Sequence, residues 1–243
     1  MGLLASATFP EINALRETMS FIAASSVEAA ARQFTSQMAQ SFETIVLGRV
    51  FLVLPFARLP SAEQAFARAL VQGDPRLADA TPCLVLVGSR GREAAWNDRG
   101  SSVGHRAIPL LDADHVASAP MLAKLLGDLN IKVAAPLTGG PVVTRLLPGG
   151  LNAAFYVQNA STAKDDRGRS VIPDQAFANK YGVNTVFGMG GSYVDGTIAV
   201  AVFFTTEQLE RMVVDRYPSL IGNFKMATAD LMNEGRIFEE PSK

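Results

Sequence analysis

Residues 198–204 constrain the fold more than any other segment, because the sequence IAVAVFF is apolar at every position. A strand that is apolar on both faces belongs at the centre of a sheet. A second strand-like run covers residues 183–189, and the Asp195-Gly196 pair between the two runs favours a primed turn. We therefore expect a hairpin near the end of the chain, with its second arm in the middle of the sheet.

Apolar runs elsewhere in the chain predict the remaining elements of the central part. The runs at 49–54, 61–72 and 83–88 are bounded by proline, glycine or serine, which are typical of turns and helix ends. We expect strands over residues 49–54, 83–88 and 153–157, helices over 61–72 and 119–129, and a turn or mobile loop over 136–150. Ser61 is the expected cap of the first helix, and Pro120 lies in the first turn of the second.

Amphipathic helices are predicted at both ends of the chain. Apolar residues recur at helical spacing over residues 10–43, with a weak point at Ser25-Ser26. This stripe either packs on the sheet of its own domain or pairs partly with a second subunit. The C-terminal helix should begin at a Thr206 cap and break or kink at Pro218. Its expected apolar side consists of Leu209, Met212, Val213, Leu220, Phe224 and Leu231.

This order of elements predicts one α+β domain with a central antiparallel sheet and helices packed on one face. We divide it into an N-terminal helical segment at 1–44, a core at 45–205, and a C-terminal helix and tail at 206–243. The first segment is the expected dimerisation element.

Composition excludes several classes of function. The net charge is −1, with 22 basic and 23 acidic residues, which argues against a nucleic-acid partner. No apolar run reaches the roughly 18 to 20 residues of a membrane span. We read no signal peptide at the N-terminus. The only cysteine, Cys83, falls within a predicted strand, so we expect a buried thiol and no internal disulfide. A cytoplasmic location fits these features.

The polar segment from Trp96 to Arg106 is the expected ligand-binding region. It follows the predicted strand 83–88, and a loop carried by a buried strand is a common way to line a site. Tyr156 and Tyr181 could add hydroxyls to the same pocket. The candidate ligand-binding residues are Trp96, Asn97, Asp98, Arg99, His105, Arg106, Tyr156 and Tyr181.

Each of these residues also has a structural interpretation. Asp98, Arg99 and Arg106 could form an ion-pair network instead of contacting a ligand. Trp96 could stack on a planar ligand or close the edge of the core. His105 could ligate a metal or haem, or it could hold the turn through backbone hydrogen bonds. The two tyrosines could be packing residues with a wet tip.

Several motifs resemble those of bacterial GAF-like sensory input modules. The resemblance covers about residues 45 to 230. It is carried by the stretch that begins at Cys83 and includes Trp96-Asn97-Asp98-Arg99, Gly104-His105-Arg106-Ala107-Ile108-Pro109-Leu110 and Pro120-Met121-Leu122, and by Ile172-Pro173-Asp174-Gln175-Ala176-Phe177, Tyr181-Gly182-Val183, Val186-Phe187-Gly188 and Gly190-Gly191. Such modules precede histidine kinase, diguanylate cyclase or PP2C-type phosphatase domains. The resemblance implies a fold of the PAS/GAF superfamily, a sensory or regulatory role in signal transduction, and a homodimer.

The preferred hypothesis is a non-enzymatic bacterial sensor that binds a small molecule between its sheet and the segment from Trp96 to Leu110. The sequence ends near residue 243, so we expect output through a separate signalling protein. No hydrolase or metalloprotease motif appears, and the ligand and cofactor are not specified by the sequence. Two alternatives stay open, a haem or metal sensor that uses His105 and a structural assembly protein whose pocket is filled by its own side chains.

Overall fold

The computed structural model describes residues 2–134, 142–145 and 153–239, and its centre is a six-stranded antiparallel sheet. The strand order is β3-β2-β1-β8-β7-β6, and a separate two-stranded sheet pairs β4 with β5. The strands are β1 (Ile45–Pro55), β2 (Pro82–Gly91), β3 (Ala107–Pro109), β4 (Ile131–Ala134), β5 (Val142–Arg145), β6 (Ala153–Val157), β7 (Thr185–Ser192) and β8 (Ile198–Thr205). The expected α+β class and antiparallel sheet are confirmed, and β8 lies inside the sheet as its apolar sequence requires.

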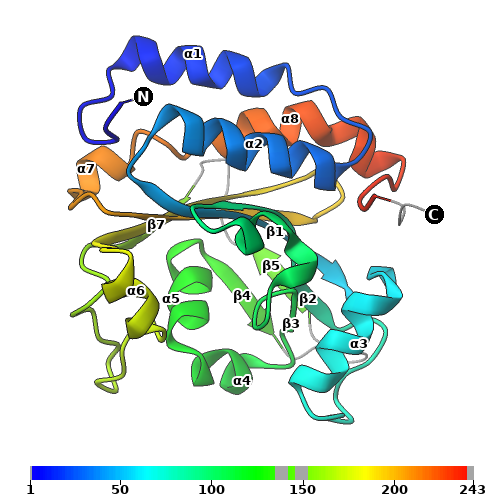
Figure 1. Ribbon diagram of the computed structural model, residues 1–243. Coiled ribbons are helices and arrows are strands. Elements are labelled where there is room, and N and C mark those ends of the chain that lie inside the picture. Colours follow the sequence, from blue (N-terminus) through cyan, green and yellow to red (C-terminus); the bar gives the residue numbers. More distant parts are fainter. Residues whose placement is uncertain (1, 135–141, 146–152, 240–243) are drawn as a thin grey trace.

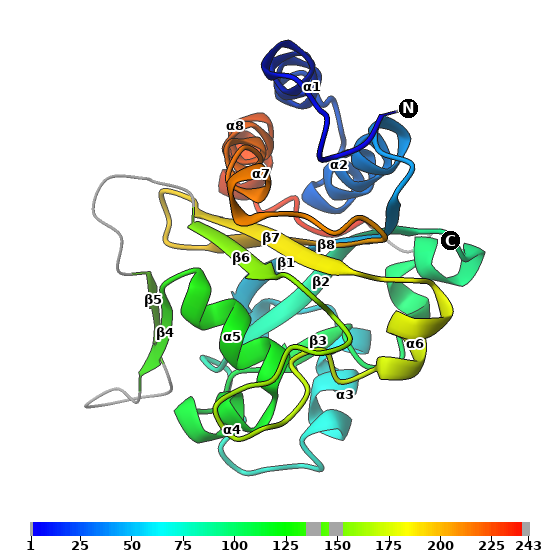
Figure 2. The same cartoon turned by 90° about the vertical axis from the view of Figure 1, so that its left-hand side faces the viewer.

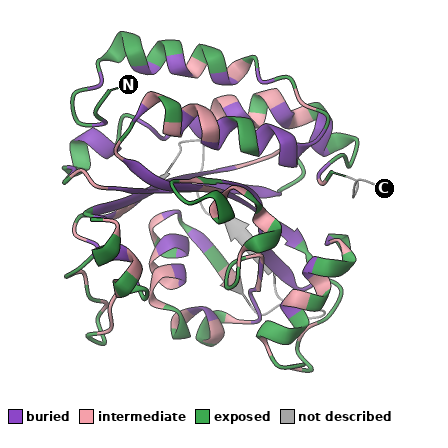
Figure 3. Ribbon diagram, in the orientation of Figure 1, coloured by how far each residue is buried: buried purple, intermediate pink, exposed green. Residues whose placement is uncertain are grey.

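Helices cover both faces of the sheet, which corrects the expectation of one covered face (Figures 1 and 2). One layer holds α1 (Phe9–Ser20), α2 (Val27–Ser41), α7 (Arg211–Val214) and α8 (Ser219–Asn233). The opposite layer holds α3 (Ser61–Leu70), α4 (Ala113–Ser118), α5 (Pro120–Asp128) and α6 (Gln175–Lys180), together with β4 and β5. A strand that is apolar on both faces needs both layers, and Figure 3 shows the sheet as buried between them.

The N-terminal stripe divides into two helices at the predicted serine pair. Ser26 caps α2 by accepting a hydrogen bond from the Ala29 N–H, and α1 begins at a capping box. The apolar side of α2 packs on the same chain, where the Phe34 ring lies 5.3 Å from that of Phe224 and 6.3 Å from that of Phe203. The described stripe therefore packs on its own sheet and on α8, as the first interpretation holds.

Gly88 of β2 is needed for the close packing of α2 on the sheet. A Cβ at this position would lie 2.6 Å from the backbone carbon of Ala31. The register of β1 and β2 also shifts between Val50 and Phe51, so that β2 carries one extra residue. This bulge lies in the part of β2 that β3 does not pair with, since the β2–β3 register ends at Val85.

The hairpin of β7 and β8 is confirmed, but its turn is not of the primed type. Gly196 has a φ of +86° while Asp195 does not have a positive φ, whereas a type I′ turn requires positive φ at both central residues. The Gly196 N–H donates to the Tyr193 carbonyl, and the Tyr193 N–H donates to the Thr197 carbonyl. These features fit a type I turn followed by a glycine bulge.

Several predicted helix ends were wrong. Ser61 is the first residue of α3 and makes no capping hydrogen bond. Thr206 begins no helix; its N–H donates to the Thr44 carbonyl, and the chain turns helical only at Arg211. Pro218 does separate α7 from α8, as expected.

Two further expectations are corrected or fall outside the described residues. Met212 is 71% exposed, so it does not belong to the apolar side of the C-terminal segment. Residues 142–145 pair with β4 as β5, where a turn or loop was predicted. The rest of that prediction, 136–141 and 146–150, lies outside the described residues.

Candidate functional site

The segment 96–106 folds over the free edge of β2 as two short 3-10 turns, Ala94–Asn97 and Arg99–Ser101. Asn97 fixes its start, because its Oδ1 accepts the N–H of Gly91 at 2.8 Å. Asp98 caps the second turn by accepting the Gly100 N–H and the Ser101 hydroxyl, both at 2.9 Å. The hydrogen bonds from Gly100 and Ser101 lower the pKa of Asp98. Asn97 and Asp98 therefore shape the segment through their own side chains.

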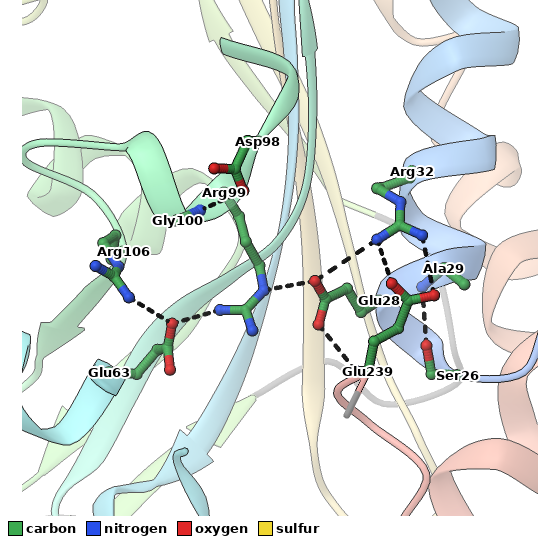
Figure 4. A network of polar contacts seen from close by, with 10 residues as sticks. All are labelled: Ser26, Glu28, Ala29, Arg32, Glu63, Asp98, Arg99, Gly100, Arg106 and Glu239. Carbon is green, nitrogen blue, oxygen red and sulfur yellow. Dashed lines mark hydrogen bonds and ion pairs between the residues drawn. The ribbon is translucent and has the colours of Figure 1, made fainter. Parts of the chain in front are cut away.

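Arg99 joins two helices that lie in different layers (Figure 4). Its Nε lies 2.8 Å from Glu28 Oε1 of α2, and its Nη1 lies 2.5 Å from Glu63 Oε1 of α3. Arg106 adds a second contact to the same Glu63 oxygen at 3.0 Å. Glu63 is 2% exposed, so its ion pairs are partly shielded from water. Removing one partner would leave a buried charge without its counter-ion and would lower the stability of the fold.

The electrostatics of Glu63 follow from these contacts. Burial raises the pKa of Glu63, but the hydrogen bonds and positive charges of Arg106 and Arg99 outweigh burial and lower its pKa overall. The carboxylate is therefore ionised at neutral pH. Among the two interpretations of Arg99 and Arg106, the structure displays the ion-pair network.

The network continues from Glu28 to the C-terminal part of the chain. Arg32 lies 3.7 Å from Glu28 and 2.6 Å from Glu239, whose N–H in turn donates to Glu28 at 3.0 Å. A pocket of about 250 Å³ opens at this junction. It is lined by Glu28, Arg32, Val87, Gly88, Ser89, Asn97, Asp98 and Arg99.

Trp96 packs within an aromatic cluster at the edge of the core. Its ring centroid lies 5.5 Å from that of Phe177 and 4.8 Å from that of Tyr181, both edge-on. The Tyr181 hydroxyl donates to Glu93 at 2.7 Å. These contacts match the interpretation in which Trp96 closes the core edge, and they bring Tyr181 to the segment as predicted.

Tyr156 lies at the other end of the sheet, on β6, and is not brought together with the segment 96–106. Its hydroxyl donates to the Leu209 carbonyl at 2.6 Å. Tyr156 also lines a second pocket of about 630 Å³, whose wall includes the charged stretch from Lys164 to Arg169. This pocket lies between α5, β6 and that stretch, so Tyr156 belongs to a different region.

His105 is exposed and borders neither of these two pockets. Burial and the positive charge of Arg49 lower its pKa, and Asp174 opposes this effect. The imidazole is neutral at neutral pH, which suits a ligand atom for iron or zinc. No group of three or more His, Cys, Asp or Glu side chains in the described part of the chain could join it around a metal ion.

Arg49 and Ser89 are polar residues of the sheet face that sequence analysis did not single out. They lie opposite each other in the β1–β2 pair, and neither the Arg49 Nε nor the Ser89 hydroxyl has a hydrogen-bond partner among the described residues. The available signal was a lone arginine in the apolar run IVLGRVFLVL, a position that a buried strand disfavours. The predicted strand over residues 49–54 includes Arg49 only as its first residue.

Two other sequence expectations concern the cysteine and the absence of a membrane span. Cys83 is buried, and burial raises the pKa of its thiol to about 12. No helix among the described residues has the length and apolar character needed to cross a membrane.

Three GAF domains are among the solved structures to which this chain is similar. The GAF domain of an Acinetobacter phosphoenolpyruvate-protein phosphotransferase has 12% identity and a TM-score of 0.44, with coverage of 91% of this chain and 92% of that one. The phycoerythrobilin-bound GAF domain of a cyanobacterial phytochrome has 10% identity and a TM-score of 0.46, with coverage of 92% and 97%. A phycocyanobilin-bound GAF domain from a cyanobacterial phytochrome has 9% identity and a TM-score of 0.48, with coverage of 92% and 96%.

No protein-family model and no curated protein matches the sequence.

Proposed function

We propose that this protein is a non-enzymatic sensory or regulatory module that binds a small polar molecule at the segment 96–106 and signals through its terminal helices. The observation that carries the proposal is the position of Arg99. One guanidinium holds Glu28 of the terminal-helix layer and Glu63 of the opposite layer. A ligand that engages the segment therefore acts directly on a contact that reaches α2.

The charges around the small pocket indicate how binding is coupled to the helices. Two acids, Glu28 and Asp98, and two arginines, Arg32 and Arg99, line the same 250 Å³ space. A polar ligand there competes for the partners of Arg99 and Arg32, and differential binding to two arrangements of the network shifts their populations. The Arg32–Glu239 pair extends this effect to the C-terminal segment.

Exposed apolar residues of the terminal helical segments support a homodimer as the signalling unit. Three large apolar side chains lie uncovered in the single chain, with Phe9 75% exposed, Phe21 82% exposed and Met226 70% exposed. Exposed apolar residues rimmed by polar ones are typical of association surfaces. A Phe21→Ser variant should shift the mass measured by light scattering towards the monomer, whereas a Val194→Ser variant of an exposed turn residue should not.

The direct test is native mass spectrometry of protein purified from its own host, followed by thermal-shift titration of the molecule that co-purifies. Arg32→Ala removes one wall of the pocket at a side chain that is 44% exposed, so the variant should fold and bind at least tenfold more weakly. Arg211→Ala removes an exposed ion pair elsewhere and serves as the control. Unchanged affinity in Arg32→Ala would refute this location, and an empty protein that no small molecule stabilises would refute the sensor proposal.

One observation favours the assembly-module alternative. Trp96 is in contact with Phe177 and Tyr181, as expected if the space beneath it is filled by the protein's own side chains. In that case the purified protein carries no added mass and its oligomeric state does not respond to small molecules. The haem alternative at His105 stays a prediction, tested by a Soret band that is lost in His105→Ala.

A further inference from the structure

Arg49 is a positive charge in the middle of the sheet without a partner among the described residues. It lies on β1, between the neighbouring strands β2 and β8, where it faces Ser89 and Val202. It has no ion pair or hydrogen bond to any described residue, and its Nε is shielded from solvent. By contrast, Arg99 and Arg106 each have a carboxylate partner.

An unpaired and half-buried guanidinium destabilises the fold unless a bound group compensates its charge. Removing a charge from water costs free energy unless a counter-ion or hydrogen bonds replace the lost hydration. Burial lowers the pKa of Arg49 to about 10, so the group remains protonated at neutral pH. The charge is therefore present, and no described residue compensates it.

Ser89 adds an unused hydrogen-bonding group beside this charge. It is directly opposite Arg49 in the antiparallel pair, so the two side chains emerge on the same face of the sheet. Ser89 is only 4% exposed, and its hydroxyl has no partner in the described structure. A buried hydroxyl without a partner is uncommon in folded proteins and points to a missing group.

Trp96, the first residue of the segment 96–106, packs on this same face of the sheet. Leu47 and Phe51, which flank Arg49 at alternate positions of β1, belong to the core cluster that Trp96 packs against. The charge of Arg49 also acts on His105, which places that imidazole within electrostatic range.

The acidic group that acts on the same imidazole does not neutralise Arg49. The Oδ1 of Asp174 accepts the Phe177 N–H at 2.8 Å as the cap of α6, and Asp174 forms no ion pair with Arg49. Arg49 therefore keeps its charge without a carboxylate partner among the described residues.

We propose that Arg49 and Ser89 bind an anionic group of the small molecule, a carboxylate or a phosphate, beneath the segment 96–106. A guanidinium offers paired donors that match the oxygens of either group, and a serine hydroxyl adds one further donor. This inference rests on the proposed sensory function and specifies the chemical class of its ligand. It also gives the unpaired charge a partner that the chain itself does not provide.

Two anions, inorganic phosphate and succinate, serve as probes of the inference. Each is titrated alongside a sodium chloride control of equal ionic strength. The readout is the melting temperature of the full chain. At tenfold excess over the dissociation constant, either probe should raise the melting temperature by roughly 3–6 °C over the chloride control. A response to phosphate alone would assign a phosphate group, and a response to succinate alone would assign a carboxylate.

Three variants separate specific binding from general salt effects. Arg49→Met should melt higher than the wild type without any probe, because it removes an uncompensated charge, and should lose the response to the probe. Ser89→Ala should fold and respond at least fivefold more weakly. Arg90→Met, at an exposed position of the same strand, should behave like the wild type.

Either of two results would overturn the inference. One is a probe response that persists in Arg49→Met, and the other is an Arg49→Met variant that melts lower than the wild type without probe. If a neutral molecule co-purifies and binds Arg49→Met with unchanged affinity, the anionic class is wrong while the sensory function stands. If nothing binds at all, both fail.

Discussion

Glu63 offers the sharpest test of the ion-pair network. Its Oε1 accepts from Arg99 at 2.5 Å and from Arg106 at 3.0 Å, and its side chain is 3% exposed. Glu63→Gln keeps the shape and one acceptor oxygen but removes the charge. Loss of one partner from a fully buried ion pair costs about 3–5 kcal/mol. The arginines are 16% and 23% exposed, and Arg99 keeps Glu28, so we expect about 2–3 kcal/mol.

Urea unfolding at pH 7 measures this loss, and the melting temperature should fall by roughly 4–12 °C. Glu234→Gln is the matched control, because it breaks an exposed ion pair with Arg236 and should change stability by less than about 0.5 kcal/mol. A loss below about 0.5 kcal/mol for Glu63→Gln would show that the network contributes nothing to stability.

The pH dependence provides an independent check on the same variant. The folded pKa of Glu63 lies below its ordinary value of 4.5, so folding favours the ionised form. The stabilisation is therefore complete above pH 4.5 and is lost as the pH falls through the folded pKa. The difference between the wild type and Glu63→Gln should shrink below pH 4.5. A difference that stays constant down to pH 3 would contradict the assignment.

Three further outcomes follow from packing. Gly88→Ala should cost about 1–3 kcal/mol in urea unfolding, since its Cβ would meet the Ala31 backbone at 2.6 Å, whereas Gly127→Ala has open space within a helix and should be neutral or stabilising. Phe34→Ala should cost about 3–5 kcal/mol, because this ring is fully buried among other rings. Cys83 should react with a thiol reagent only after unfolding, since burial raises its pKa to about 12; labelling at the rate of a free thiol in the native protein would contradict its placement.

Hydrophobic periodicity predicted the elements of the core, because the spacing of apolar residues along the sequence indicates which face of a helix or strand is buried. The break at Ser25-Ser26, the central position of residues 198–204 and the buried Cys83 all follow from it. Helix caps were less predictable, since the backbone N–H of a threonine such as Thr206 can donate to a distant residue instead of beginning a helix. Here the Thr44 carbonyl takes the Thr206 N–H, and the helix begins later.

The sequence indicated a polar segment at 96–106 but not the contacts that its residues make. The partners of Arg99 lie 71 and 36 residues away in the sequence, on α2 and α3, and no local pattern encodes how these helices lie relative to the segment. Tyr156 was grouped with the segment although its strand lies at the opposite edge of the sheet. Arg49 was overlooked because a single charge does not disturb a long apolar average.

The position of the segment 96–106 has a consequence for association between sheets. β3 pairs with β2 only as far as Val85. Beyond this point, residues of the segment accept hydrogen bonds from backbone N–H groups of β2. The Leu86 N–H donates to the Arg106 carbonyl at 2.9 Å, and the Gly91 N–H donates to Asn97 at 2.8 Å. Lifting the segment uncovers these donors and creates an open strand edge, the surface on which an extended peptide adds a further strand. The segment 96–106 thus also protects the sheet against pairing with another chain.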